Sequence, residues 1–267
     1  MKKDKFIHIG IFIIIGIFII ICAIVIILER IYYFIDNSNI NKQEIIDYIS
    51  QQTIIKEIEQ EPITVLIERE QMNSDKYSNI MLDVNNINQN PELPTGCEIT
   101  SLTIVLNYLG YDIDKLTMAD FFLIKGEIGK TDPDIAFIGN PRDEHSYGAN
   151  APVLEQTANN YLTYVKSDYH AYNVSGKDFN ELEKYIIDGY PVMVWETINM
   201  IDSYPSTKWS IDNKEIQWYA NFHCMVLIGW TTDSYIMADP LNGIVEYDKD
   251  VVIKRYNELG KQAIVIY

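Results

Sequence analysis

The chain has 267 residues, a formal net charge of −17 and a hydrophobic content of 48%. This length suffices for one core of ordinary size together with an appendage. A surface this acidic repels phosphate backbones, which argues against nucleic acid as a partner. The three cysteines, Cys22, Cys97 and Cys224, are too few and too scattered to predict a disulfide framework or a structural zinc site. We expect no metal and no organic cofactor.

The first 30 residues contain a long apolar run. From Phe6 to Leu28, 23 successive residues are apolar or glycine, apart from His8. At about 1.5 Å per residue, such a helix spans a bilayer core of about 30 Å. The run leads into charged and aromatic residues rather than a small-residue cleavage site, so we expect a retained anchor and not a signal peptide. Three lysines before the run predict a cytoplasmic N-terminus, which makes the chain a single-pass protein of the cell membrane with its bulk outside the cell.

Residues 31–80 form a polar segment that we interpret as a stalk or linker. Isoleucines repeat at roughly helical spacing between Ile45 and Ile58, which predicts a partly helical structure. A helix docked on the following domain is the alternative, and the segment could also occlude that domain as a pro-segment would.

Residues 81–267 have the pattern of one compact α+β domain, with helices first and antiparallel strands afterwards. Between them, residues 139–152 are rich in Gly, Pro and Asn and predict a loop. Helical spacing predicts helices over 97–110, 116–123, 153–162 and 178–188. Apolar runs predict strands over 191–197, 223–230, 234–238 and 263–266.

Cys97 follows the turn Pro94-Thr95-Gly96 and stands at the first position of the predicted helix. The free N–H groups and the positive dipole end of a helix stabilise a thiolate at that place. Such a thiolate becomes a nucleophilic site when a base lies within hydrogen-bond reach.

His223 and Asp239 are the matching base and orienting group. His223 opens an apolar strand, and Asp239 follows 16 residues later, after a short turn and a second strand. Such a hairpin brings its two ends together, so Asp239 can reach the imidazole ring. Each residue alone could be structural. Cys224 alternates away from the face of His223, and we interpret it as a small buried hydrophobe.

Five blocks of the sequence resemble the C39-like papain-fold cysteine peptidases, which are relatives of the bacterial bacteriocin-processing (double-glycine) peptidases. The blocks are, in order, LPTGCEITSLTIVLNYLGY, GNPRDEHSYGANAPVLEQTANNYL, GYPVMVWET, NFHCMVLIGW and MADPLNG. The resemblance spans about residues 84–267 and implies a papain-like fold, with the nucleophile helix packed on the sheet. It implies that Cys97 is the nucleophile, His223 the general base and acid, and Asp239 the orienting residue. It also implies that Gln89, eight residues before the cysteine, donates to the oxyanion, although a buried structural glutamine is the alternative.

The sequence therefore predicts a membrane-anchored cysteine peptidase that hydrolyses peptide bonds of a peptide or protein substrate through an acyl-thioester. Two alternatives stay open. One is an acyl transferase or amidase on the same fold, and the other is a catalytically inactive module that binds peptides in the cleft where an active peptidase binds its substrate.

Overall fold

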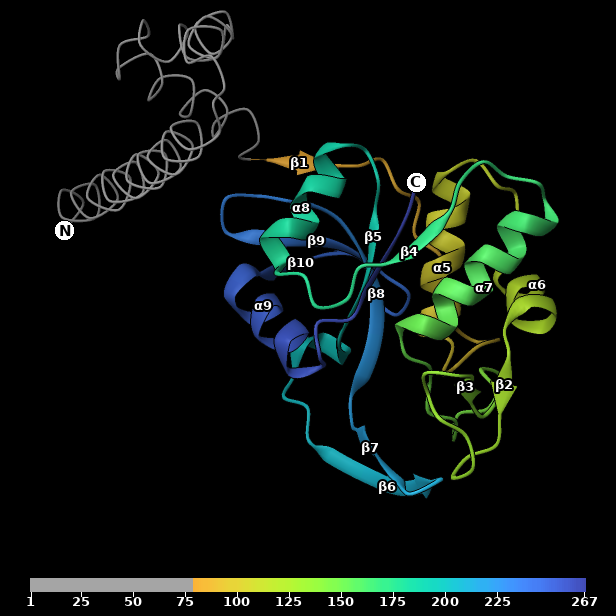
Figure 1. The fold of residues 1–267 in the computed structure, drawn as a ribbon. Helices are drawn as coiled ribbons and strands as arrows, with labels where there is room; N and C mark the ends of the chain where they lie inside the picture. Colours follow the sequence, from red (N-terminus) through yellow and green to blue (C-terminus); the bar gives the residue numbers. More distant parts are fainter. Residues whose placement is uncertain (1–78) are drawn as a thin grey trace, which may run out of the picture. The chain divides into compact units, whose positions relative to one another are not determined.

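The computed structural model describes residues 79–267, and its centre is a seven-stranded sheet (Figure 1). The strand order is β10-β9-β8-β5-β11-β4, β1 pairs with β8, and every pair in this sheet is antiparallel. The strands are β1 (Ile80–Met81), β4 (Ala171–Asn173), β5 (Val192–Thr197), β8 (Phe222–Trp230), β9 (Ser234–Asp239), β10 (Gly243–Asp248) and β11 (Ala263–Ile266).

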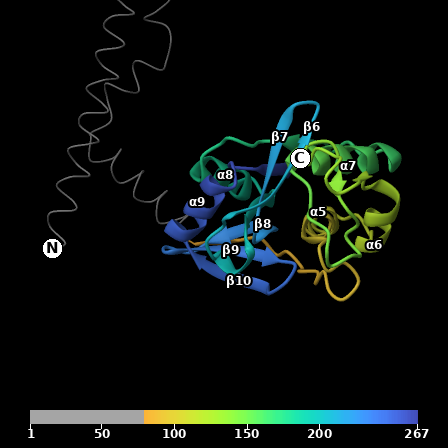
Figure 2. The same cartoon turned by 90° about the horizontal axis from the view of Figure 1, so that it is seen from below.

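Helices cover both faces of this sheet. Figures 1 and 2 show α8 and α9 to one side of it and α5, α6 and α7 to the other. Their bounds, with two short turns, are α5 (Cys97–Tyr108), α6 (Lys115–Thr117), the π-helical turn η1 (Met118–Phe122), α7 (Ala151–Tyr164), α8 (Phe179–Ile187), the 3₁₀ turn η2 (Ile198–Met200) and α9 (Lys249–Glu258). The expected α+β fold is confirmed for this domain.

None of the helices within residues 79–267 is both long enough and apolar enough to cross a bilayer. The anchor expected over residues 6–28, Cys22 and nearly all of the expected stalk lie outside the described residues.

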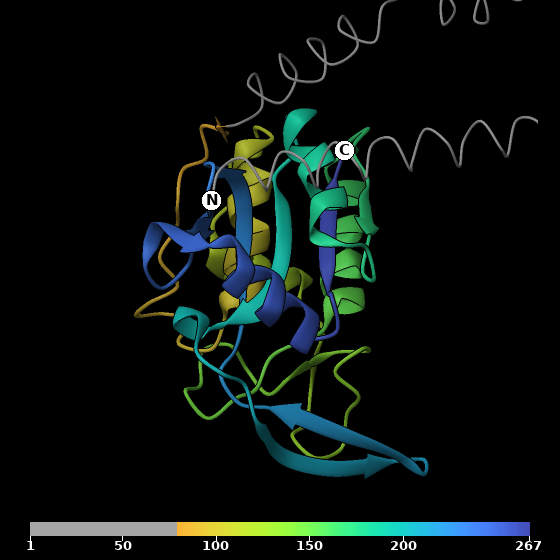
Figure 3. The same ribbon diagram turned by 90° about the vertical axis from the view of Figure 1, so that its left-hand side faces the viewer.

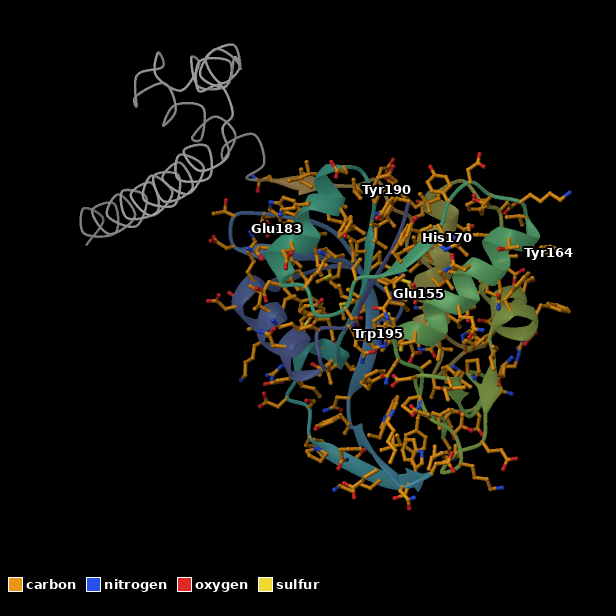
Figure 4. The ribbon with its side chains drawn as sticks, in the orientation of Figure 1. Glu155, Tyr164, His170, Glu183, Tyr190 and Trp195 are labelled. Carbon is orange, nitrogen blue, oxygen red and sulfur yellow. The ribbon has the colours of Figure 1, made fainter. Side chains whose placement is uncertain are left out.

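The two faces of the sheet carry separate apolar layers, because successive side chains of a strand point to opposite sides. On β8, Cys224 and Val226 pack toward α5 and α7, whereas Met225 and Leu227 pack toward α8 and α9. Both faces are covered, so β8 reads as a continuous apolar run in the sequence and not as an alternation. Trp195 of β5 is fully buried in the layer next to α7 (Figure 4).

Every helix and strand expected in the domain is present, with end points shifted by a few residues. The helix expected over 116–123 is a short α-helix followed by a π-helical turn. The short strands of two or three residues and the turn η2 were not expected. Four longer elements were not expected either: the two strands of the hairpin, β6 (Pro205–Ile211) and β7 (Lys214–Tyr219), strand β10, and helix α9. Their sequences are polar and largely exposed, which conceals the apolar pattern. Even so, the two-residue turn Asp212-Asn213, with positive φ at both residues, is a recognisable hairpin signal.

The β6–β7 hairpin projects from the body of the domain beside the loop that precedes α7 (Figures 1 and 3). Trp209 Nε1 donates to the carbonyl of Thr131 at 3.0 Å, and Lys214 Nζ pairs with Asp132 at 2.6 Å. Two further strands, β2 (Lys125–Gly126) and β3 (Phe137–Ile138), form a small parallel pair in this loop region.

Candidate active site

Cys97 is the first residue of α5, and a tight turn places it there. The N–H of Gly96 donates to the carbonyl of Leu93 at 2.9 Å, which closes the turn. A Cβ atom at residue 96 would lie 2.7 Å from the Cβ of Leu93 and 3.1 Å from that of Pro141, so only glycine fits. The Cys97 side chain is buried, with 7% of its residue surface exposed. As the first residue of a helix, Cys97 has a backbone N–H without an acceptor inside the helix.

The first turns of α5 pack directly on β8. The hydroxyl of Ser101, one turn after Cys97, donates to the carbonyl of Cys224 at 3.0 Å. The backbone N–H of Cys224 also interacts with the Cys97 thiol and favours its ionised form. The Cys97 thiol therefore lies beside the peptide group that joins His223 to Cys224.

His223 and Asp239 form a buried pair at the ends of neighbouring strands. His223 Nε2 lies 2.7 Å from Asp239 Oδ1, and the two side chains are 1% and 0% exposed. The ladder between β8 and β9 ends at Val226 and Ala238, and the pair lies just past that point. Because Nε2 donates to the carboxylate, the other ring nitrogen, Nδ1, is the acceptor of a neutral imidazole.

Asp239 is held by several donors besides the histidine. The N–H of Leu241 donates to Oδ1 at 2.8 Å, and the Asn242 amide donates to Oδ2 at 2.8 Å. Burial opposes ionisation of this carboxyl, but the hydrogen bonds from His223, Leu241 and Asn242 outweigh it and lower the pKa of Asp239. The group is therefore a fixed carboxylate that selects one tautomer of His223.

Glu98 is a residue of this site that sequence analysis missed. Cys97 Sγ donates to Glu98 Oε2 at 3.3 Å, and the N–H of Ala149 donates to Oε1 at 2.9 Å. Within residues 79–267, the hydrogen bond of the Cys97 thiol thus goes to Glu98 and not to His223. The available signal was an acidic residue next to the nucleophile, in the first turn of a helix that is otherwise buried.

The protonation of Cys97 differs from what its position at a helix start predicts. Burial and then the neighbouring Glu98 carboxylate raise the pKa of the Cys97 thiol well above its ordinary value. Burial likewise raises the pKa of Glu98 to about 7. In this conformation Cys97 is a neutral thiol.

Gln89 lies in the loop that joins the two halves of the site. Its backbone N–H donates to the carbonyl of Pro240 at 2.8 Å, next to Asp239. Its side-chain Nε2 donates to the carbonyls of Leu93 at 3.2 Å and Pro94 at 2.8 Å, in the turn before Cys97. The residue is 2% exposed, and its Oε1 has no hydrogen-bond partner among the described residues.

Aromatic residues of the hairpin pack at one side of the site. The ring of Trp218 on β7 packs on Phe222, at 4.6 Å between centroids, and on Tyr147, at 5.6 Å. A cavity of about 320 Å³ adjoins it, with apolar and amide side chains in its lining, among them Trp218, Phe222, Gln217 and Gln262.

The other two histidines that the structure describes, and the second described cysteine, are not part of the His223–Asp239 pair. His145 and His170 are exposed, and Cys224 is fully buried in the layer facing α5. In the described part of the chain, no cluster of three or more His, Cys, Asp or Glu side chains is arranged to hold a metal ion.

Comparison with known proteins identifies the family. Residues 81–264 match the model of the Peptidase_C39 like family, so this chain belongs to that family. The chain is 30% identical over 182 residues to the uncharacterized protein YvpB of Bacillus subtilis (strain 168), a match that covers 66% of this chain and 70% of YvpB. A crystal structure from Bacillus anthracis, whose assignment as a C39-like peptidase is itself an inference, matches with a TM-score of 0.64 and 30% identity, over 71% of this chain and 97% of that one. The fold is thus the α+β papain-like fold of C39-like peptidases, and family membership points to a peptidase-type hydrolase.

Proposed function

We propose that this protein is a membrane-anchored cysteine peptidase that hydrolyses peptide bonds with Cys97, His223 and Asp239. The observation that carries the proposal is the buried 2.7 Å contact between His223 and Asp239, next to a cysteine at the start of a helix. A buried histidine held by an ionised carboxylate, beside a thiol, is the arrangement that nucleophilic catalysis requires.

The chemistry follows from these positions. His223 Nδ1 takes the thiol proton as Cys97 Sγ attacks the substrate carbonyl, and Asp239 stabilises the resulting imidazolium. The imidazolium then gives its proton to the leaving amine, which leaves an acyl-thioester on Cys97. A water molecule, deprotonated by His223, hydrolyses the thioester and restores the thiol.

The negative oxygen of the tetrahedral intermediate needs donors near Cys97. The backbone N–H of Cys97 is one, because it opens α5. Gln89 is the second donor in this proposal, and its amide must first leave the carbonyl of Leu93 or Pro94. The backbone N–H of Gln89 donates to the carbonyl of Pro240, so a movement of Gln89 is coupled to the loop that follows Asp239.

The membrane part of the proposal rests on the sequence alone. An apolar run of 23 residues after three lysines supports a single-pass anchor with the catalytic domain outside the cell. A membrane-impermeant amine reagent applied to intact cells should label lysines of residues 81–267. Labelling that requires cell lysis would contradict an extracellular domain.

Peptide-library cleavage by the full-length protein in detergent tests the activity. The wild type should cleave, Cys97→Ala and His223→Ala should not, and Cys224→Ala should retain measurable activity. Addition of an amine nucleophile separates hydrolysis from acyl transfer, because a transferase converts the acyl-enzyme to a new amide. An active Cys97→Ala variant would refute the proposal.

A further inference from the structure

The carboxyl group of Glu98 is held directly against the nucleophile. Its Oε2 accepts from Cys97 Sγ at 3.3 Å, and its Oε1 accepts from the N–H of Ala149 at 2.9 Å. The residue is fully buried. Neither the triad chemistry nor the oxyanion donors described above use this group.

Gly148 and Trp218 enclose a space that the Glu98 carboxyl group fills. A Cβ atom at residue 148 would lie 2.2 Å from Glu98 Oε1, so the absence of a side chain at Gly148 makes room for the carboxyl. The φ of +147° at Gly148 disfavours any other residue there as well. The ring of Trp218 lies 3.3 Å from the same point and closes the space from the hairpin. The fold thus positions a carboxyl group beside the sulfur and keeps water from it.

Both protonation states of Glu98 are accessible near neutral pH. Burial raises the pKa of Glu98 to about 7, against a smaller opposing effect of the Ala149 N–H. No lysine or arginine is among the groups that set this pKa in the described part of the chain. The titratable groups on the elements around it are Cys97 on α5, His223 and Cys224 on β8, Glu196 on β5 and Asp239 on β9.

We propose that Glu98 controls the protonation of the nucleophile: its carboxylate keeps Cys97 as a thiol, and its protonated form donates to the sulfur and permits the thiolate. This inference rests on the proposed peptidase function. The resting site holds a carboxylate, a thiol and a neutral imidazole. A solvent proton binds Glu98, and the thiol proton moves to His223 Nδ1, which leaves a thiolate between a carboxylic O–H and an imidazolium. The peptidase is therefore most active at mildly acidic pH.

The test is the rate of Cys97 alkylation by iodoacetamide in the full-length protein in detergent, with mass spectrometry to locate the label. In the wild type the rate should fall about tenfold between pH 6 and pH 8, as a group with a pKa near 7 loses its proton. Glu98→Gln retains the shape of the side chain and an N–H donor toward the sulfur. The decrease in alkylation rate between pH 6 and pH 8 should therefore disappear in this variant. Glu144→Gln, at an exposed position, is the matched control and should behave as the wild type.

The outcomes separate this inference from the proposed function. If Glu98→Gln and the wild type show the same pH profile while Cys97 still depends on His223, the role of Glu98 is wrong and the peptidase proposal stands. If Glu98→Gln does not fold, infrared spectroscopy of the wild type decides. A carboxylic C=O band that shifts on alkylation of Cys97, and is present at pH 6 and lost at pH 8, supports the inference. The absence of such a band overturns it.

Discussion

Asp239 Oδ1 lies 2.7 Å from His223 Nε2, and both side chains are shielded from solvent. A carboxylate at this position fixes which ring nitrogen carries the proton, and so directs the basic Nδ1 away from Asp239. The thiol of Cys97 lies beside the backbone of the next residue, Cys224, so in the proposed mechanism the orientation of the ring decides whether Nδ1 serves as the base.

Replacement of Asp239 by Asn should leave the fold intact and reduce kcat/KM by roughly 10²- to 10⁴-fold, because the amide favours the wrong tautomer of His223. Steady-state cleavage of a peptide found in the library screen measures this. Asn242→Ala removes one donor to the same carboxylate and should cost far less. Equal losses in the two variants would show that Asp239 serves only as a packing element.

The buried carboxyl group of Glu196 should make the stability of the folded domain depend on pH. Its carboxyl is fully buried, neither oxygen has a hydrogen-bond partner among the described residues, and burial raises its pKa well above the ordinary value. The folded state therefore keeps a proton that the unfolded chain releases above about pH 4.5. Its contribution to stability is fully present below that pH and is lost as the pH rises toward the folded-state pKa.

Glu196→Gln should therefore raise the melting temperature at pH 8 relative to the wild type and change it little at pH 4. Thermal unfolding followed by circular dichroism measures this, with the exposed Glu144→Gln as control. A variant that is equally shifted at both pH values would contradict a proton held by Glu196.

Ser101 fixes α5, which begins at Cys97, to β8, which carries His223. Ser101→Ala removes the 3.0 Å bond to the Cys224 carbonyl and should lower the free energy of unfolding by about 1–3 kcal/mol. Activity should fall further than stability explains, since Cys97 is displaced from His223. Thr103→Val, which removes a buried hydroxyl bonded within the same helix at 2.7 Å, controls for loss of a hydrogen bond alone. If both variants retain the same activity, the contact with Cys224 does not position the nucleophile.

Trp218 of the β6–β7 hairpin should influence the pKa of the Glu98 carboxyl group. Trp218→Ala should admit water to the Glu98 carboxyl and lower its pKa, which moves the fall in Cys97 alkylation to lower pH. Trp209→Ala removes an aromatic residue of the same hairpin that binds Thr131 and packs on Tyr147 without contacting the Glu98 carboxyl, and it should leave the profile unchanged. The same profile in the wild type and both variants would argue against shielding by Trp218.

The sequence predicts the site best where the chemistry depends on local spacing. The turn before Cys97 and the strand-turn-strand interval between His223 and Asp239 are short-range patterns, and the structure has both. Strands such as β8 could be predicted from a continuous apolar run because helices cover both faces of the sheet. These elements account for the papain-like core.

What the sequence conceals depends on contacts between distant segments. Glu98 looks like a favourable acidic residue in a first helical turn, and only the approach of Gly148 and Trp218 shows that it is buried against the sulfur. The amide of Gln89 binds nearby carbonyls for a similar reason, since its loop is folded back on the turn at Pro94. A thiol at a helix start is expected to have a lowered pKa. Burial, which no local sequence pattern indicates, raises the pKa of Cys97 instead.

The most direct measurement is the rate at which iodoacetamide labels Cys97 at pH 6 in the full-length wild type and in His223→Ala. The pKa of Glu98 is about 7, so Glu98 is mostly protonated at pH 6; His223 can then take the thiol proton, and the resulting thiolate reacts below the ordinary thiol pKa of about 8.5. We expect fast labelling of Cys97 in the wild type and at least tenfold slower labelling in the variant. Slow labelling at the same rate in both proteins would contradict an activated Cys97–His223 pair and with it the peptidase function.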